Sequence, residues 1–309
     1  MSEPLIDTLL EMLKSPDLAQ RRAAIMGLGT VSNPTPSVAR GLIDLLLGED
    51  EALVSDAIRA LGLVRPVIGE AVREMLDDLR SAEPSRRLRG AWHLAFIGSS
   101  QSFESGCPEE VGRLLLESIR DPDPELRRPL CHALGSWGVE PQRALPALSE
   151  RLEDESSDVR ASACSAIGRY TGAAVSLVPT LAARLRDPDP WVRERATRAL
   201  EEVFDTHRDA SNLQIPAVPA EDAEAPPPSP GTSAQGGGSP TVRELLCGLL
   251  QDADFGCVLA ALQALSRLAP LSAEEIEAIR ALKSHADDQV RIQAGSLLRL
   301  ATRQRPGRS

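Results

Sequence analysis

The chain has 309 residues, of which 42% are hydrophobic, 26% are charged and 3% are aromatic, and its net charge at pH 7 is −11. Nucleic-acid-binding surfaces need a basic footprint that displaces counterions from phosphates, so this acidic chain is not expected to bind nucleic acid. No apolar run approaches the roughly 18–20 residues of a membrane-spanning helix, and we expect no membrane association.

The beginning of the sequence and the cysteines indicate a compartment. The first residues, MSEPLIDTLLEMLKSPD, carry early acids and lack a basic n-region, so a secretory signal is not expected. The five cysteines are scattered without CxxC spacing, which predicts neither a disulfide framework nor a zinc site. We therefore expect a reducing cytoplasm. The excess of arginine over lysine, which occurs only at Lys14 and Lys283, favours a bacterial origin.

One sequence motif recurs along the chain. It begins with an apolar residue that is usually followed by an arginine, and it continues with small residues and ends with an aliphatic residue. It is clearest at Val159–Ile167 and at Val192–Leu200. The last aliphatic residues of successive copies are separated by 33, 33, 40, 33, 33, 65 and 33 residues. These residues are Leu28, Leu61, Leu94, Leu134, Ile167, Leu200, Leu265 and Leu298. A fixed period of this length predicts a repeat architecture of about eight units.

Two intervals are longer, and composition explains both. The interval of 40 contains a polar stretch, 99–107, which we interpret as a longer loop. The interval of 65 contains residues 205–240, rich in Pro, Gly and Ser, which cannot bury enough apolar surface to offset their ordering entropy. The predicted organisation is repeats 1–6 over 1–204, a disordered acidic linker over 205–240, repeats 7–8 over 241–302 and a basic flexible tail over 303–309.

Each repeat is expected to be a pair of helices. Over 177–185 the apolar residues follow a helical stripe. The turn Asp187-Pro-Asp-Pro190 then stops that helix, and Asp189 can cap a second helix that runs from Trp191 to about Phe204. No useful stretch alternates with period 2, so no sheet is expected. The predicted fold is all-α, an α-solenoid in which small residues such as Ala163, Ala166, Ala196 and Ala199 let helices approach closely.

The pattern resembles the HEAT repeat, especially the short bacterial variety of phycobilisome-lyase-like proteins. The resemblance rests on Asp121-Pro-Asp-Pro-Glu-Leu-Arg127, Asp154 with Asp158-Val-Arg160, Asp187-Pro-Asp-Pro-Trp-Val-Arg193, and Asp287-Asp-Gln-Val-Arg291. It covers nearly the whole chain outside 205–240 and the tails. Ankyrin repeats share the period, but their Thr-Pro-Leu-His signature is absent. The resemblance implies that the Asp and Arg residues form a ladder, with the turn Asp of one repeat beside the Arg of the next. The expected ladder consists of Asp121, Arg127, Asp154, Arg160, Asp187, Arg193 and Arg291.

Catalytic and cofactor signals are lacking in the sequence. The four histidines, His93, His132, His207 and His285, are not followed by Glu, which opposes the di-iron chemistry of deoxyhypusine-hydroxylase-like HEAT proteins. We interpret His93 and His132 as core or groove-lining residues, and Cys131, Cys164 and Cys257 as small buried hydrophobes. No GxxxxGK[ST], GxGxxG or GxSxG motif occurs. We expect no enzymatic activity, no cofactor and no bound metal.

The expected function is a non-catalytic scaffold that presents a concave helical surface to another protein. Aromatic residues at helix edges are candidates for partner contacts, namely Trp191, Trp137 and, in the longer loop, Phe103. Residues 1–204 carry a net charge of −8 and residues 241–309 of +1, which favours a basic partner segment for the larger block. The resemblance leaves open a second function, a tetrapyrrole lyase or chaperone. A regulatory role of the 205–240 linker also stays open.

Overall fold

The computed structural model describes residues 3–32, 34–45, 50–64, 68–100, 107–205, 240–268 and 270–303. The predicted linker therefore lies outside the described residues except at its two ends, as do Phe103 and residues 304–309. Two compact units divide the chain, Met1–Val139 and Glu140–Ser309. They are called unit 1 and unit 2 below.

The described residues form α-helices, short 3₁₀ segments and turns without a β-strand, as predicted. The helices of unit 1 are α1 (Glu3–Met12), α2 (Leu18–Gly29), α3 (Pro36–Asp44), α4 (Glu51–Leu63), α5 (Ile68–Leu79), α6 (Pro84–Ser100), α7 (Glu109–Ser118) and α8 (Pro124–Ser136). Those of unit 2 are α9 (Pro141–Arg151), α10 (Ser157–Gly168), α11 (Val178–Ala183), α12 (Pro190–Phe204), α13 (Val242–Gly248), α14 (Phe255–Arg267), α15 (Ala273–Ala281) and α16 (Asp288–Arg303). None of these is long and apolar enough to cross a bilayer.

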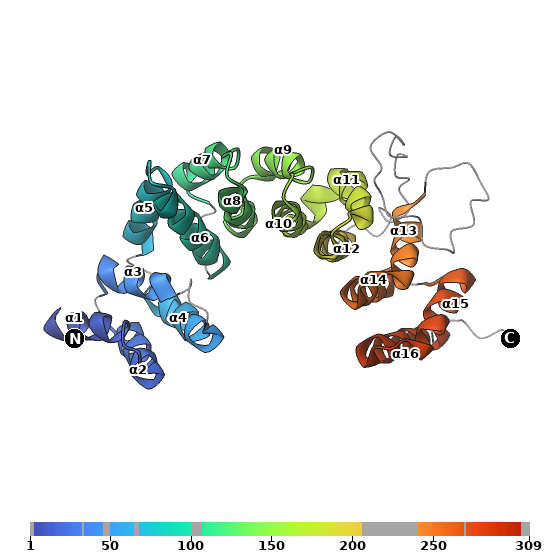
Figure 1. Ribbon diagram of the computed structural model, residues 1–309, viewed down its shortest axis with the longest axis horizontal. Helices are drawn as coiled ribbons and strands as arrows, with labels where there is room; N and C mark the ends of the chain where they lie inside the picture. The colour runs from blue at the N-terminus through green and yellow to red at the C-terminus, as the bar shows by residue number, and fades with distance from the viewer. Residues whose placement is uncertain are drawn as a thin grey trace. The chain divides into compact units, whose positions relative to one another are not determined.

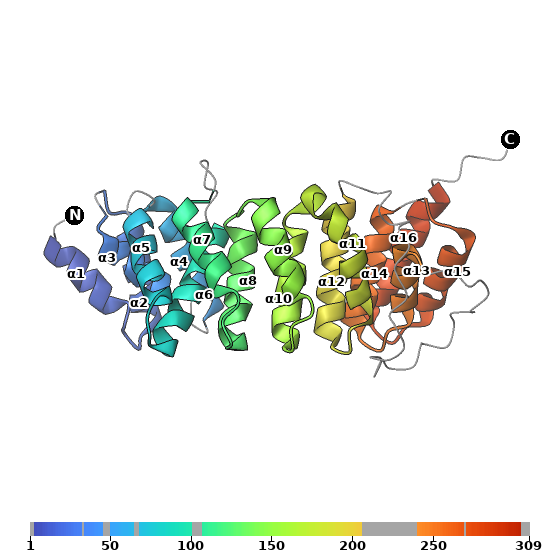
Figure 2. The ribbon, with the colours of Figure 1, turned by 90° about the horizontal axis from the view of Figure 1, so that it is seen from above.

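Within each unit the helices stack as successive pairs, which confirms the α-solenoid (Figures 1 and 2). The first, odd-numbered helix of each pair lies on one side of the stack and the second, even-numbered helix on the other (Figure 1). Each even helix packs on the next even helix of its unit. The core lies between the two layers. We call the solvent-facing sides of these layers the odd-helix face and the even-helix face.

Aspartates fix where many of the even helices begin. The carboxylates of Asp17, Asp123 and Asp189 each accept the backbone N–H two residues further on. Asp50 accepts the N–H groups two and three residues on, and Asp254 accepts the one three residues on. A proline follows the capping aspartate in α8 and α12, where its missing N–H costs nothing. The predicted role of the Asp-Pro pairs, to end one helix and to start the next, is confirmed for Asp189.

Small residues bring the even helices of unit 2 close together. Ala163, Ala166, Ala196 and Ala199 are all buried. Gly168 also permits a close approach, since an added Cβ would lie 3.0 Å from the Cα of Ala199. The sequence-based expectation for these positions is therefore confirmed, and α10 and α12 form one of the closely packed pairs of the unit.

One predicted helix is less regular than expected. The stripe over 177–185 forms a 3₁₀ segment (Thr171–Leu177), the short helix α11 and a second 3₁₀ segment (Arg184–Arg186). Pro179 is the reason for the late start, because its ring and missing N–H restrict it to the first turn of a helix. The tighter last turn brings the backbone N–H of Asp187 to the carbonyl oxygen of Arg184, and similar 3₁₀ turns follow α13 and α15.

Candidate functional site

The ladder residues of unit 2 link successive repeats. Arg160 on α10 donates from Nε and Nη2 to the two carboxylate oxygens of Asp187, each at 2.8 Å. Asp187 is almost fully buried, and its Oδ1 also accepts the backbone N–H of Asp189. The planar guanidinium thus makes a two-point, charge-assisted contact that joins two repeats and shapes the turn of the second.

The same contact recurs one repeat later with a partner that sequence reasoning missed. Arg193 on α12 donates to Asp252 at 2.8 and 2.7 Å. Asp252 follows the 3₁₀ turn after α13, and its Oδ1 accepts the backbone N–H of Asp254. Asp252 lies 65 residues after Asp187, the same interval that separates Leu200 from Leu265. The repeat spacing therefore carried the signal that could have identified it.

The direction of the ladder corrects the expectation from the resemblance. The arginine of one repeat reaches the turn aspartate of the following repeat, whereas the reverse order was expected. Unit 1 shows the same order, with the Nε of Arg87 on α6 3.7 Å from Asp121. Each of these arginines lies in the first turn of its even helix and donates from Nη1 to carbonyl oxygens of its own turn, so its other nitrogens contact the following repeat.

These carbonyl contacts are common to all the expected ladder arginines. Arg160 donates to the carbonyl oxygens of Asp154 and Glu155, and Arg193 to those of Asp187 and Pro188. Arg127 is buried and donates to the backbone carbonyl oxygens of Asp121 and Pro122. Arg291 donates to those of His285 and Ala286. Asp154 is buried and accepts the N–H of Ser156. Contacts with a neighbouring repeat are thus described for Asp121, Arg160, Asp187 and Arg193. The contacts described above for Arg127, Asp154 and Arg291 lie within their own turns.

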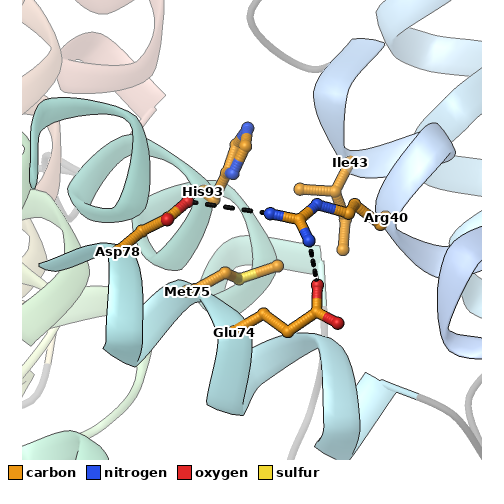
Figure 3. Close-up of a pocket in the computed structure, with 6 residues that line it drawn as sticks. All are labelled: Arg40, Ile43, Glu74, Met75, Asp78 and His93. Atoms are coloured by element: carbon orange, nitrogen blue, oxygen red, sulfur yellow. Dashed lines mark hydrogen bonds and ion pairs between the residues drawn. The ribbon is translucent and has the colours of Figure 1, made fainter. Parts of the chain in front are cut away.

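A second charged cluster lies in unit 1, in a small pocket lined by Arg40, Ile43, Glu74, Met75, Asp78 and His93 (Figure 3). Its centre is the buried carboxylate of Asp78 on α5. Arg86 donates to Oδ1 at 2.9 and 2.7 Å, and Arg89 donates to Oδ2 at 3.0 and 2.8 Å. Burial raises the pKa of Asp78, but these hydrogen bonds outweigh it, so the pKa lies below its usual value and the carboxylate stays ionised.

His93 projects from α6 into the same pocket and is 4% exposed (Figure 3). Burial, followed by the charge of Arg89, lowers its pKa to about 4, so the imidazole is neutral at pH 7. Its Nε2 has no hydrogen-bond partner and lies 3.6 Å from Oδ1 of Asp44. Nowhere among the described residues do three or more His, Cys, Asp or Glu side chains gather as metal ligands. The arrangement is a charge-balanced contact between α3, α5 and α6.

The cysteines have the environments of structural residues. Cys131, Cys164 and Cys257 are buried, as expected. Burial raises the pKa of Cys164, of Cys257 and of the half-buried Cys247 to about 12, so these thiols stay protonated near neutral pH. Since the thiolate is the nucleophile, none of the three is activated for covalent chemistry.

The tryptophans predicted as partner contacts have different environments. Trp137 is 3% exposed, and its Nε1 donates to the carbonyl oxygen of Leu94 at 2.7 Å. The prediction that Trp137 contacts a partner is therefore wrong, because the ring is buried against α6. Trp191 is 44% exposed, with the guanidinium of Arg195 3.9 Å from its ring centroid. It remains a candidate for a partner contact.

Most of the exposed large apolar side chains belong to the even helices. Eight large hydrophobic residues are exposed among those described, and seven of them lie on even helices. The most exposed are Met26 on α2 (70%), Ile292 on α16 (67%) and Leu63 on α4 (65%). The others on even helices are Leu18, Trp191, Phe255 and Leu300. Periodicity alone did not reveal this asymmetry.

Comparison with known proteins establishes the family. The model of HEAT repeats matches residues 6–100 and 112–201, which is more than half of the chain. The chain belongs to the HEAT-repeat family. This confirms the resemblance that was inferred from the Asp and Arg motifs.

Solved structures are similar to this HEAT-repeat chain at low sequence identity. An engineered protein, 18% identical, has a TM-score of 0.50, with 96% of this chain and 78% of that chain covered. A designed armadillo repeat protein is 17% identical and has a TM-score of 0.48, with 74% of this chain and 99% of that chain covered. A computationally designed armadillo repeat protein for modular peptide recognition is 18% identical and has a TM-score of 0.47, with 74% of this chain and 98% of that chain covered. No curated protein matches the sequence.

Proposed function

We propose that this HEAT-repeat protein is a non-catalytic scaffold that binds another protein through its even-helix faces. The observation that carries the proposal is the concentration of exposed large apolar side chains on the even helices. Large apolar side chains that one layer leaves exposed are candidates for contacts with another protein. The protonated thiols and the fully hydrogen-bonded carboxylate of Asp78 support the absence of a catalytic role.

The charge of the partner depends on the face considered. The net charge of 1–204 favours a basic segment for that block as a whole. In unit 1, however, carboxylates are concentrated on the odd helices, such as Glu3 and Asp7 on α1 and Glu109 and Glu110 on α7. A basic segment would therefore meet its complement on the odd-helix face.

Site-specific photo-crosslinking tests the proposal. A photoreactive amino acid replaces Leu63 on α4 or Phe255 on α14, and in matched controls it replaces Glu117 on α7 or Glu277 on α15, which are exposed odd-helix positions. In native cell extract we expect one partner protein to crosslink from the even-helix positions and not from the controls. Equal labelling from both faces, or turnover of a small molecule by the purified protein, would contradict the proposal. A change in bilin absorbance on mixing would favour the tetrapyrrole alternative.

A further inference from the structure

Charge is segregated between the two layers of unit 1. The odd helices α1, α3, α5 and α7 contain eleven carboxylates and three arginines. The even helices α2, α4, α6 and α8 contain eight arginines and three carboxylates. The acidic balance of the whole chain therefore does not describe the even helices of unit 1, which have an excess of arginine. Of these arginines, Arg127 is buried in its own turn, and Arg86 and Arg89 pair with Asp78 of α5. The charge that matters for binding is therefore that of the exposed arginines. The helices of unit 2 show no comparable segregation.

Part of this positive charge is exposed at the α2–α4 contact. Arg22 on α2 lies 2.9 Å from the carboxylate of Asp56, and Arg59 on α4 lies 3.4 Å from the same group. The side chain of Asp56 is 11% exposed, while those of Arg22 and Arg59 are 51% and 75% exposed. One shielded carboxylate thus faces two accessible guanidinium groups, and the surface presents a net positive charge.

An aromatic cluster continues this surface on α6 and α8. The rings of Trp92 and Phe96 stack with their centroids 5.8 Å apart, and the guanidinium of Arg128 lies 5.5 Å from the Trp92 centroid. All three side chains are half-buried, so each offers one side to solvent. Trp92 and Phe96 are four residues apart and therefore share one face of α6.

The repeat register aligns these residues into a row. Met26, Arg59, Trp92 and His132 are separated by 33, 33 and 40 residues, the intervals of the repeat itself, and occupy equivalent positions on α2, α4, α6 and α8. Leu63 and Phe96 form a parallel pair one turn further on. Because each even helix packs on the next, equivalent positions lie along the stack. We call this surface the aromatic–arginine row.

We propose that the aromatic–arginine row binds an acidic protein segment that carries an aromatic or large aliphatic residue. This inference rests on the proposed scaffold function and specifies its partner. Carboxylates of the segment would pair with Arg22, Arg59 and Arg128, because guanidinium groups bond carboxylates at two points. An aromatic or aliphatic side chain would pack on Trp92 and Phe96, where rigid rings provide large contact area. A basic segment would be repelled from the same surface.

Selection of peptides on the full-length protein tests this proposal. Random peptides of about twelve residues, displayed on phage, are selected on the immobilised chain, and enriched sequences are synthesised for anisotropy titration. We expect enrichment of sequences with excess Asp and Glu and at least one aromatic residue. Arg59→Glu and Trp92→Ala should each weaken binding by about tenfold or more, and salt should weaken it further.

A charge-matched control separates local from general effects. Arg113→Glu on α7 makes the same change of charge on the odd-helix face of unit 1, where Arg113 is half exposed. It should alter the affinity by no more than about twofold. Circular dichroism melts verify that each variant is folded, and Arg59→Glu changes only an exposed side chain.

Several results would overturn the inference. These are enrichment of basic or uncharged sequences, absence of enrichment, affinity unchanged by Arg59→Glu and Trp92→Ala, or equal competition by a single-stranded oligonucleotide. If enriched peptides lose binding only with Phe255→Glu in unit 2, this inference fails while the scaffold function stands. Failure of the photo-crosslinking experiment above would instead reject the scaffold function itself.

Discussion

Arg193 and Asp252 are 59 residues apart in sequence, yet two hydrogen bonds of 2.8 and 2.7 Å join them. Other contacts accompany this pair. The Sγ of Cys257 lies 3.3 Å from the carbonyl oxygen of Pro190, and Arg267 forms an ion pair with Glu201. In sequence, residues 206–239 lie between the two helices α12 and α14. The two helices nevertheless stack directly on each other.

The first prediction concerns this insertion. Replacing residues 206–239 with about five Gly and Ser residues should leave the amide hydrogen-exchange protection of α12 and α14 unchanged, because loop-closure entropy changes slowly with length. Arg193→Ala in the same shortened chain serves as the positive control and should lower protection in both helices. Loss of protection in the shortened chain alone would show that the stack depends on the inserted residues.

The second prediction concerns the ladder. Arg160→Ala should destabilise the α10–α12 region by about 1–3 kcal/mol, because it leaves the buried carboxylate of Asp187 without its charged donor. Arg198→Ala is the matched control, since Arg198 is half exposed and pairs with Glu194 one turn away on the same helix. Denaturant-dependent hydrogen exchange measures the change in each helix. Equal effects of the two substitutions would contradict the assignment.

The third prediction concerns the cluster around Asp78. Asp78→Asn should destabilise unit 1 by about 2–3 kcal/mol, because the amide cannot accept four hydrogen bonds from Arg86 and Arg89. The cost stays below that of a fully buried pair, because both arginines are partly exposed and can turn toward water. Asp77→Asn, at the exposed neighbouring position, should have little effect in the same thermal melts.

The fourth prediction concerns pH. The pKa of His93 is lowered to about 4 in the folded chain, from a reference value of 6.5. The unfolded chain therefore binds more protons between these values, and stability falls as pH decreases from about 6.5 to about 4, by about 3 kcal/mol in total. The groups facing His93 are Arg40 and Asp44 on α3, Asp78 on α5 and Arg89 on α6.

His93→Gln removes this contribution, so its stability should depend less on pH than that of the natural chain over the same interval. Comparing the two proteins in denaturant titrations isolates His93 from the carboxylates that both contain. Parallel pH profiles would show that the imidazole does not resist protonation in the folded state.

The sequence predicts the repeats well because their signals are local. A 33-residue period, Asp-Pro turns and small residues in the even helices all act within one hairpin or between neighbours. The environment of Trp137 could not be predicted in this way. It depends on Gly98 of the preceding repeat, where an added Cβ would lie 2.6 Å from the indole ring.

The candidate binding surface could not be predicted from local sequence signals either. Met26, Arg59 and Trp92 are equivalent in the repeat, but they share no chemistry, so no motif connects them. Their shared register on the even helices and the different charge of the two layers become visible only when the odd and even helices are considered separately. Net charge over 1–204, which favours a basic partner, averages over both layers and conceals the basic one.

The direct stacking of α12 on α14 makes the intervening position suitable for engineering. Because neighbouring repeats hold each other there, the chain tolerates additional residues between them at small entropic cost. We therefore expect that a folded guest domain whose termini lie close together can be inserted between α12 and α13 without displacing either repeat. The natural chain thus offers an insertion site at which a reporter or an enzyme domain can be attached to the scaffold.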